Sequence, residues 1–432
     1  MEAKPVVFGR KQRRIALGLM VTLGGSLVLQ SGAIAEKIRP SAGQKQYLDG
    51  VYTQSLEAGE AFQQAMDLYQ RREFRTAQQY IEQALKFDPW MPMGHYLQGQ
   101  LFLEAKKPGK AQESYRLATQ YDPRFTAAYY NLGLVSYDLG DLRGAITAFR
   151  TAIRLDPEFV NAYFQLGLAY DVQGDSQQAI DQYVRVLNLD DRYVPAYNNL
   201  GIILAEQGRT EEAVTNFEQA IAIDPNYSAA HYQLGLLYLK QNELELALNT
   251  VGEAANIDPN NALAQYHYGL LLAETGNYGR AADRFRKAID LNPNNVAAYR
   301  QLGVAELSNG NLNKALVAFQ EAINLDPEDA NSHYNLGVVY QKLTQYDRAI
   351  AAYQQALIYD PRLSDAVFNI GVSYHALGES RQSTTFLVQA RELFAQEGRD
   401  FKVQEVDRFL RLQVLPQVNP TAEEPPATPE QT

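Results

Sequence analysis

Residues 126–157 read TAAYYNLGLVSYDLGDLRGAITAFRTAIRLDP, and close copies of this stretch follow one another along most of the chain. A glycine marks the repeat most plainly, because it returns every 34 residues. It occupies positions Gly99, Gly133, Gly167, Gly201, Gly235, Gly269, Gly303, Gly337 and Gly371. A fixed period of this length is typical of stacked helix pairs, in which each unit packs only against its neighbours.

Within residues 126–157 the spacing of small and apolar residues predicts two helices. The first has an inner face at i, i+3, i+4 spacing, made of Ala128, Tyr129, Leu132, Gly133 and Ser136. Gly140 interrupts it, since glycine readily takes the left-handed conformation that ends a helix. The second has an inner face made of Ala145, Ala148, Phe149, Ala152 and Ile153. Asp156 and Pro157 close it, because proline has no N–H to continue the helix. We expect the small residues at Gly133 and Ala145 to let the two helix backbones approach closely.

The repeated phrase is an aromatic residue, Leu-Gly, Ala, an aromatic residue, Ala and a closing Pro, and it resembles the tetratricopeptide repeat family. The resemblance covers about residues 56–395 and implies ten repeats. It implies an all-α fold, a right-handed superhelical solenoid of antiparallel helix pairs. Departures are few: Asp191 replaces the closing proline, and Asn242 and Thr344 replace the turn glycine. Because threonine tolerates the left-handed conformation poorly, we expect a loosened turn at Thr344.

The two ends of the chain differ from the repeats. Residues 36–55 form a polar linker, with a short leading helix expected around residues 44–52. Residues 396–415 predict a capping helix over the last repeat, with Val403, Val406, Phe409, Leu410 and Leu412 on its apolar face. Residues 416–432 are rich in proline and glutamate and predict a disordered tail.

Residues 1–35 have the pattern of a targeting segment. Basic residues precede the apolar run from Ile15 to Leu29, which is followed by the small residues Ala33 and Ala35. This pattern predicts a secretory signal peptide cleaved after Ala35. The alternative is an uncleaved anchor that tethers the chain to an inner membrane through residues 15–35. Both versions place the repeats outside the cytoplasm, in a compartment resembling the periplasm.

The composition and the residue spacing give little indication of a catalytic, metal or nucleic-acid site. The chain has no cysteine, and its net charge of −11 argues against a nucleic-acid partner. The repeats and caps leave no stretch for a catalytic domain, so we expect no enzyme activity, no cofactor and no metal site. Three of the five histidines (His95, His231 and His333) occupy a slot that tyrosine holds in other repeats, and we expect them to be structural. We assign His267 and His375 the same role, and we interpret the recurrent aspartates before proline as turn residues.

The candidate binding residues follow from the resemblance, which implies that the first helix of each repeat lines a concave groove. Three positions flank the repeat glycine there: a ring three residues before it, an amide two before it and an aliphatic residue just after it. The candidates are Tyr130, Asn131, Leu134, Phe164, Leu168, Asn199, Tyr232, Leu236, Tyr266, Leu270, Tyr334, Asn335, Phe368 and Asn369. Amides beside rings suit an extended peptide, which they can hydrogen-bond while the rings stack on its side chains. The alternative is that these residues only follow the family consensus and pack against the adjacent first helix.

The position after the glycine also distinguishes between binding modes. Relatives that clamp a partner's C-terminal carboxylate have asparagine there, whereas this chain has Leu, Ile or Val in every repeat from Gly133 onward. An apolar strip suits a hydrophobic or amphipathic segment better. The sequence therefore predicts a non-catalytic scaffold that binds other proteins or peptide segments, with a role in assembly or secretion at the cell envelope. The alternative is a structural component that self-associates through its convex face or its ends. The oligomeric state stays open.

Overall fold

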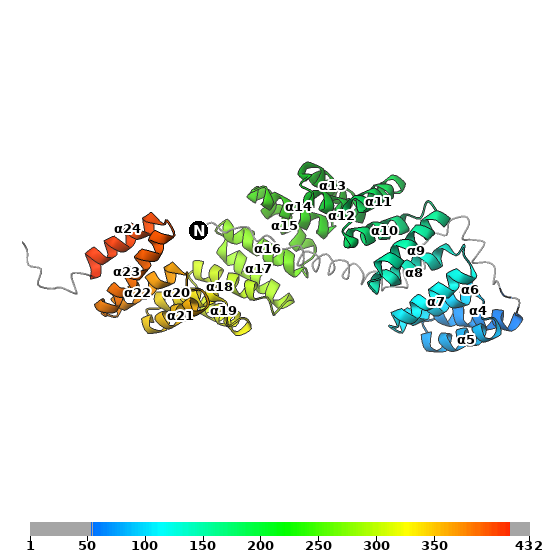
Figure 1. Ribbon diagram of the computed structural model, residues 1–432, viewed down its shortest axis with the longest axis horizontal. Helices are drawn as coiled ribbons and strands as arrows, with labels where there is room; N and C mark the ends of the chain where they lie inside the picture. The colour runs from blue at the N-terminus through cyan, green and yellow to red at the C-terminus, as the bar shows by residue number, and fades with distance from the viewer. Residues whose placement is uncertain (1–52, 54, 415–432) are drawn as a thin grey trace, which may run out of the picture. The chain divides into compact units, whose positions relative to one another are not determined.

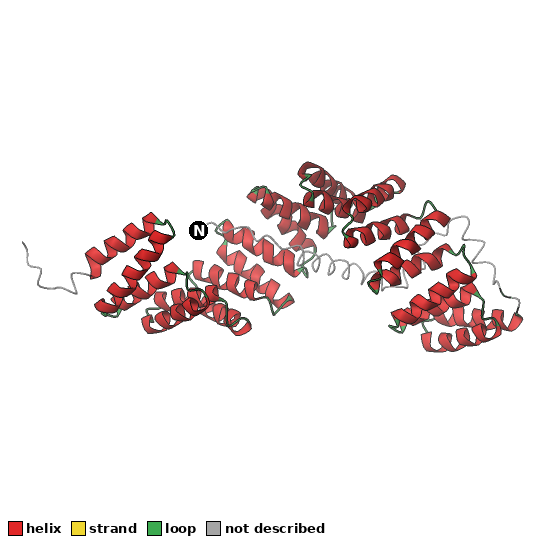
Figure 2. Cartoon of the chain, in the orientation of Figure 1, coloured by secondary structure: helices red, strands yellow, loops and turns green. Residues whose placement is uncertain are grey.

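The computed structural model describes residue 53 and residues 55–414, and this part of the chain consists of helices joined by short turns, with no strand (Figure 2). The predictions for residues 1–35, for the leading helix around 44–52 and for the tail at 416–432 concern residues outside the described part. None of the helices that the structure describes has the length and apolar content needed to cross a membrane.

The described residues form ten helix pairs followed by a final helix (Figure 1). The first helices are α4 (Leu56–Gln70), α6 (Pro92–Glu104), α8 (Thr126–Asp138), α10 (Val160–Gln173), α12 (Val194–Glu206), α14 (Ser228–Lys240), α16 (Ala262–Glu274), α18 (Val296–Ser308), α20 (Ala330–Lys342) and α22 (Ser364–Ala376). The second helices are α5 (Phe74–Phe87), α7 (Pro108–Tyr121), α9 (Leu142–Leu155), α11 (Ser176–Leu189), α13 (Thr210–Ile223), α15 (Leu244–Ile257), α17 (Tyr278–Leu291), α19 (Leu312–Leu325), α21 (Tyr346–Tyr359) and α23 (Ser380–Gln396). The predicted all-α solenoid of helix pairs is confirmed. The described residues divide into two compact units, with the boundary between residues 216 and 217, inside α13.

The turn between one pair and the next is built on aspartate. In the turn after α9, the carboxylate Oδ1 of Asp156 accepts the backbone N–H of Glu158 at 3.2 Å, while the N–H of Asp156 still donates to the helix. The same bond recurs at Asp190, whose Oδ1 accepts the N–H of Arg192 at 3.0 Å although Asp191 replaces the proline. A short carboxylate that caps its own turn explains why the turn survives this substitution. The interpretation of these aspartates as turn residues is confirmed.

The turn inside a pair depends on one left-handed residue. Gly310 has φ 81°, and in the corresponding turns Asn242 has φ 63° and Thr344 has φ 58°. The prediction of a loosened turn at Thr344 is wrong, because Thr344 and Gln345 donate to the end of α20 at 3.0 and 2.9 Å, the distances seen in the glycine turns. Packing of the two flanking helices holds the turn in place, so the cost of the left-handed threonine remains as strain.

The core of each pair is made of alanine and one large side chain. Ala145, Ala148, Phe149 and Ala152 are buried on α9 as predicted. The expectation for Gly133 needs correction, because a Cβ placed there would lie 2.5 Å from the ring of Phe149 and not against backbone. Close backbone approach occurs where the ring is missing: at Gly235 the same Cβ would lie 3.0 Å from the backbone nitrogen of Val251. The glycine therefore makes room chiefly for a ring.

The inner face of the first helix also differs in part from the prediction. Ala128, Gly133 and Ser136 are buried, but Tyr130 is buried in place of its neighbour Tyr129, which is half-buried. The periodicity could not distinguish the two tyrosines, because each has an apolar partner one turn away. Tyr130 is the buried one because it packs against the ring of Phe149, whose centroid lies 5.9 Å from that of Tyr130.

The last described residues pack on α23 and form α24 (Asp400–Phe409) and one π-helical turn, η1 (Leu410–Val414). Val406 and Val414 are buried there in one cluster with Phe394. Leu412, predicted on the apolar face, is instead 57% exposed. The wider π turn brings the residue five positions after Phe409 to the apolar face, where an α-helix would place the third or fourth.

Candidate functional site

The three predicted rows lie on the first helices, and each row is described within its own unit. The ring row packs sideways against the second helix of its own repeat. The ring centroid of Phe164 lies 5.8 Å from that of Tyr183 and 5.1 Å from that of Tyr193, and Tyr334 lies 5.7 Å from Tyr353. Phe164, Tyr266, Tyr334 and Phe368 are half-buried, so part of each side chain remains exposed.

Two other rings of the row, those of Tyr130 and Tyr232, are buried. Tyr130 is 8% exposed and Tyr232 is 4% exposed. Burial raises the pKa of both phenols well above the ordinary value. Tyr130 lies between Phe149 and Phe159, whose ring is 4.8 Å away. The sequence placed these two residues on an open face, and their contacts make them part of the packing between repeats.

The amide row is bonded to the ring row of the preceding repeat. Asn131 donates its Nδ2–H to the hydroxyl of Tyr96 at 2.9 Å, and Asn369 donates to the hydroxyl of Tyr334 at 3.3 Å. His267 takes the same place in its repeat, with Nδ1 2.7 Å from the Tyr232 hydroxyl. Rings and amides are therefore brought together, but across neighbouring first helices. Each asparagine amide has a second N–H and a carbonyl oxygen besides the N–H that this bond uses.

The remaining amides follow a less regular pattern. Asn199 accepts the Nδ2–H of Asn198 at 3.2 Å, and Asn335 is half-buried. Asn198 stands where other repeats have a ring, and it is 5% exposed.

The aliphatic row is partly exposed in every repeat from Gly133 onward. Leu134, Leu168, Leu236 and Leu270 are half-buried, neither enclosed nor fully open. In the last repeats the corresponding valines, Val304, Val338 and Val372, pack partly against the adjacent core clusters. Packing against neighbouring helices therefore accounts for part of the surface of these three valines, and the rest of each side chain contributes apolar surface.

The histidines have structural partners. His95, His231 and His333 each place Nε2 2.8–3.0 Å from the carbonyl oxygen of the proline six residues earlier. Burial lowers the pKa of His267 to about 4, so this ring is neutral at pH 7. The ring of His375 packs edge-on against Phe409 at 5.3 Å. Among residues 55–414, no three His, Asp or Glu side chains gather closely enough to hold a metal ion.

An electrostatic feature that the sequence did not reveal lies at the C-terminal ends of the first helices in the first unit. Burial raises the pKa of Asp171 to about 6, and the nearby carboxylate of Glu206 raises it further. Burial also raises the pKa of Asp138. Carboxylates at a helix C-terminus are disfavoured by the helix dipole as well. Asp171 therefore carries its negative charge fully only well above pH 6.

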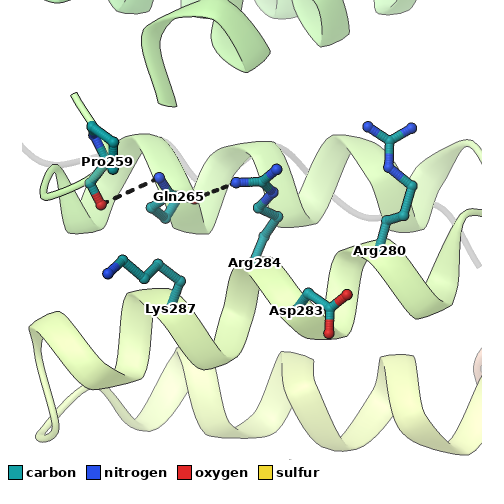
Figure 3. A pocket seen from close by; sticks show the side chains of 6 residues that line it. All are labelled: Pro259, Gln265, Arg280, Asp283, Arg284 and Lys287. Carbon is teal, nitrogen blue, oxygen red and sulfur yellow. Dashed lines mark hydrogen bonds between the residues drawn. The ribbon is translucent and has the colours of Figure 1, made fainter. Parts of the chain in front are cut away.

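A second feature that the sequence did not reveal is a hollow of about 330 Å³ beside α16 and α17 (Figure 3). Its lining consists of Pro259, Gln265, Arg280, Asp283, Arg284 and Lys287. None of the predicted groove residues belongs to it. The signal in the sequence was the i, i+4, i+7 spacing of three cations, together with a glutamine in the slot that tyrosine or histidine holds elsewhere.

Comparison with known families finds the same repeat along the chain. A family model described as TPR repeat matches residues 133–174, 203–242, 269–309 and 305–343. Three models described as tetratricopeptide repeat match residues 330–363, residues 62–125 and 96–142, and residues 160–193 and 228–261. The matched stretches lie between residues 62 and 363.

Solved structures similar to this chain are shorter repeat proteins. YrrB, described as a TPR protein with an unusual peptide-binding site, is 25% identical over 44% of this chain and 97% of its own, with a TM-score of 0.39. MamA is 27% identical over 37% of this chain and 94% of its own, with a TM-score of 0.37. PilF of Pseudomonas aeruginosa is 22% identical over 50% of this chain and 98% of its own, with a TM-score of 0.39. No protein of curated function matches the sequence.

Proposed function

The chain belongs to the tetratricopeptide repeat family, and from this premise we propose that it is a non-catalytic protein-interaction scaffold of the cell envelope. Its first helices bind segments of partner proteins, and its role lies in assembly or secretion. The repeats are preformed, so binding orders little of the scaffold itself, and weak contacts from several repeats add together.

The observation that carries this proposal is the aliphatic row. Leu134 and Leu168 in the first unit, and Leu236 and Leu270 in the second, all keep part of their surface exposed. Rings such as Phe164 and Tyr266 lie two helical turns or less away on the same helices. Apolar surface that recurs along one face is typical of a surface that a partner covers. An extended or helical segment with apolar side chains fits such a row.

Contact at this row is tested by photo-crosslinking in cells. A photoreactive phenylalanine analogue replaces Leu168 or Leu270 in one pair of variants, and Val317 on α19, which is 58% exposed, in a control. We expect adducts with a discrete partner from the first-helix positions and none from Val317. Adducts of the same mass from all three positions would contradict binding at the row.

A pair of matched substitutions tests how much the aliphatic row contributes to partner binding. Leu236→Gln and Leu270→Gln together should weaken capture of the crosslinked partner by at least about tenfold, because two apolar contacts are lost. The control is Leu246→Gln on α15, where the side chain is 46% exposed and lies on a second helix. Equal capture by all variants would count against the aliphatic row as the binding surface.

The envelope location rests on the N-terminal sequence, in which basic residues, an apolar run and Ala33-Ile34-Ala35 follow one another. We propose export, with either cleavage after Ala35 or a tether through residues 15–35. Fractionation of cells followed by N-terminal sequencing tests both versions. A mature chain that begins at Glu36 in the soluble extracytoplasmic fraction supports cleavage, and an intact N-terminus in the membrane fraction supports the tether. An intact chain in the cytoplasm contradicts export.

A second candidate function is self-association through the ends of the array. Two large apolar side chains favour it: Phe401 is 76% exposed and Leu412 is 57% exposed, both near the C-terminal end. Sedimentation of the purified chain and of the Phe401→Ser variant separates the two functions. A dimer that dissociates on this substitution supports self-association, whereas a monomer in both samples excludes it.

A further inference from the structure

The hollow beside α16 and α17 has the chemistry of an anion site (Figure 3). Arg280, Arg284 and Lys287 stand on one face of α17, at positions i, i+4 and i+7. This spacing places them along about 10 Å of the helix. The chain as a whole carries a net charge of −11, so three cations around one hollow depart from its average surface.

The two arginines are held in place by neutral partners. Arg284 donates Nη1–H to Oε1 of Gln265 at 3.3 Å, and its guanidinium lies 5.0 Å from the centre of the Tyr268 ring. Arg280 donates Nη2–H to the Tyr268 hydroxyl at 2.9 Å. Gln265 is 1% exposed and is itself fixed, because its Nε2 donates to the carbonyl oxygen of Ala255 at 2.8 Å. Each guanidinium has five N–H donors, so most of them remain for a ligand.

The positive charge of the hollow is not neutralised within the described residues. Asp283 is the one acid in the lining, and its carboxylate pairs with Arg286 at 2.5 Å. Arg286 also pairs with the buried Glu306. Arg280, Arg284 and Lys287 form no ion pair with any residue in the part of the chain that the structure describes. Like charges at i, i+4 destabilise a helix, and no ion pair within the described residues offsets this cost.

Three departures from the chain's own repeat pattern build this arrangement. Gln265 stands in the slot of Tyr129 and His231, and Tyr268 stands in a slot that leucine holds in neighbouring repeats. Gly252 occupies a slot that carries a larger side chain in the other repeats, and a Cβ there would lie 3.1 Å from the Tyr268 ring. The glutamine and the tyrosine are the groups that hold the arginines, and the glycine makes room for the tyrosine. A merely solvated helix face needs none of these changes.

We propose that this hollow binds an acidic segment of a partner protein, through two or three carboxylates of an extended chain. A guanidinium fork binds a carboxylate through two parallel hydrogen bonds, which suits Arg280 and Arg284. The 10 Å between the first and last cation equals about three residues of extended peptide. A volume of about 330 Å³ is large enough for the carboxylate side chains of such a segment. The site lies outside the three first-helix rows, so it stands independently of the groove.

Binding is measured on the full chain with a fluorescent eight-residue peptide that contains three glutamates, and with the same peptide carrying glutamines. We expect the glutamate peptide to bind and the glutamine peptide to bind at least about tenfold more weakly. The affinity should fall as salt rises, because the cations are partly exposed. Equal binding of the two peptides overturns the proposal.

Two variants locate the site. Arg284→Gln should weaken the glutamate peptide at least about tenfold, whereas Arg348→Gln should leave it unchanged. Arg348 is a matched control, since it too lies over a tyrosine ring, at 5.9 Å from the centre of Tyr340. Unchanged circular dichroism and urea midpoints verify that both variants are folded. An equal effect of the two substitutions overturns the assignment to this hollow.

Two further measurements distinguish the occupant. Inorganic phosphate that displaces the peptide at equal or lower concentration would show a small-anion site and contradict a segment. The chain's own residues 415–432 contain Glu423, Glu424 and Glu430. If a chain truncated after Val414 binds the glutamate peptide much more tightly, and a peptide of residues 415–432 competes for it, the occupant is this segment and not a partner. Unchanged binding after truncation supports the partner.

Discussion

Replacing Gly133 by alanine should destabilise the first unit, although alanine is the better helix former. A Cβ at position 133 would lie 2.5, 2.6 and 2.9 Å from three ring carbons of Phe149. Carbon atoms in contact prefer about 3.5–4.0 Å, so the ring would have to retreat by about 1 Å. Phe149 is 0% exposed and also packs against the ring of Tyr130, at 5.9 Å between centroids, so it has little space to move.

The magnitude follows from two opposed effects. Overpacking a filled core costs about 1–3 kcal/mol, and displacing a whole ring edge belongs near the upper limit. Replacing glycine by alanine inside a helix stabilises the helix by about 1 kcal/mol. We therefore expect Gly133→Ala to lower the free energy of unfolding by about 2 kcal/mol.

Gly109 provides a matched control within the same unit. It lies in the first turn of α7, and a Cβ there would meet no atom within 4 Å. Gly109→Ala should therefore raise the free energy of unfolding by about 0.5–1 kcal/mol, since only the helix preference changes. Urea unfolding followed by circular dichroism at 222 nm measures both variants. The same substitution is thus expected to have opposite signs at two positions.

A double-mutant cycle with Phe149→Ala identifies the cause. Once the ring is removed, Gly133→Ala should no longer destabilise, and the coupling between the two positions should reach about 2–3 kcal/mol. If Gly133→Ala is as stable as the parent, or if the coupling is absent, the ring is not the reason for the glycine and the reasoning fails.

Three further predictions follow from the strain, titration and packing of other residues. Thr344→Gly should stabilise by about 0.5–1 kcal/mol, because relief of a left-handed threonine exceeds the entropy cost of glycine, and Gly310→Thr should destabilise by a similar amount in the same urea assay. The folded pKa of Asp171 is raised to about 6 from 3.8, so the folded chain binds more protons between these values and its stability should fall as pH rises from about 4 to 6. The Asp171→Asn variant should lack this slope and be more stable than the parent by up to about 3 kcal/mol at pH 7; a slope that persists in the variant would assign it to other groups. Val414→Ser should destabilise by about 1–3 kcal/mol and Leu412→Ser by little, since only the first side chain is buried, and equal thermal shifts would contradict the π-turn register.

The sequence correctly predicted which helices carry the candidate binding residues, but it predicted only in part which of their side chains are exposed. The spacing from the repeat glycine placed Tyr130, Leu134 and Tyr266 on first helices, as the structure has them. It could not show that Tyr130 is enclosed by Phe149 and Phe159, because the second ring belongs to the start of the next repeat. Whether a side chain on a first helix is exposed to solvent depends on which side chains of the neighbouring repeat lie beside it.

The hydrogen bonds between the amide row and the ring row could not be predicted from the sequence either, because they join side chains of neighbouring repeats. Asn131 and Tyr96 are separated by 35 residues, one more than the period, and nothing in either repeat alone indicates that they meet. The hollow at Arg284 also arises from contacts between helices, since Gln265 and Tyr268 lie on α16 and the cations on α17.

The sequence by itself determined the helix pairs, their period and their turns. Period, helix breaks and capping are local: glycine at the left-handed turn residue, Asp156 and Pro157 at the close, and alanine at the inner face act within a few residues of themselves. Only the tertiary structure decided what the glycines accommodate, which rings stay open and where charge gathers. Those properties depend on distances between side chains of different helices, and a repeat period specifies which helices are neighbours without specifying the space left between them.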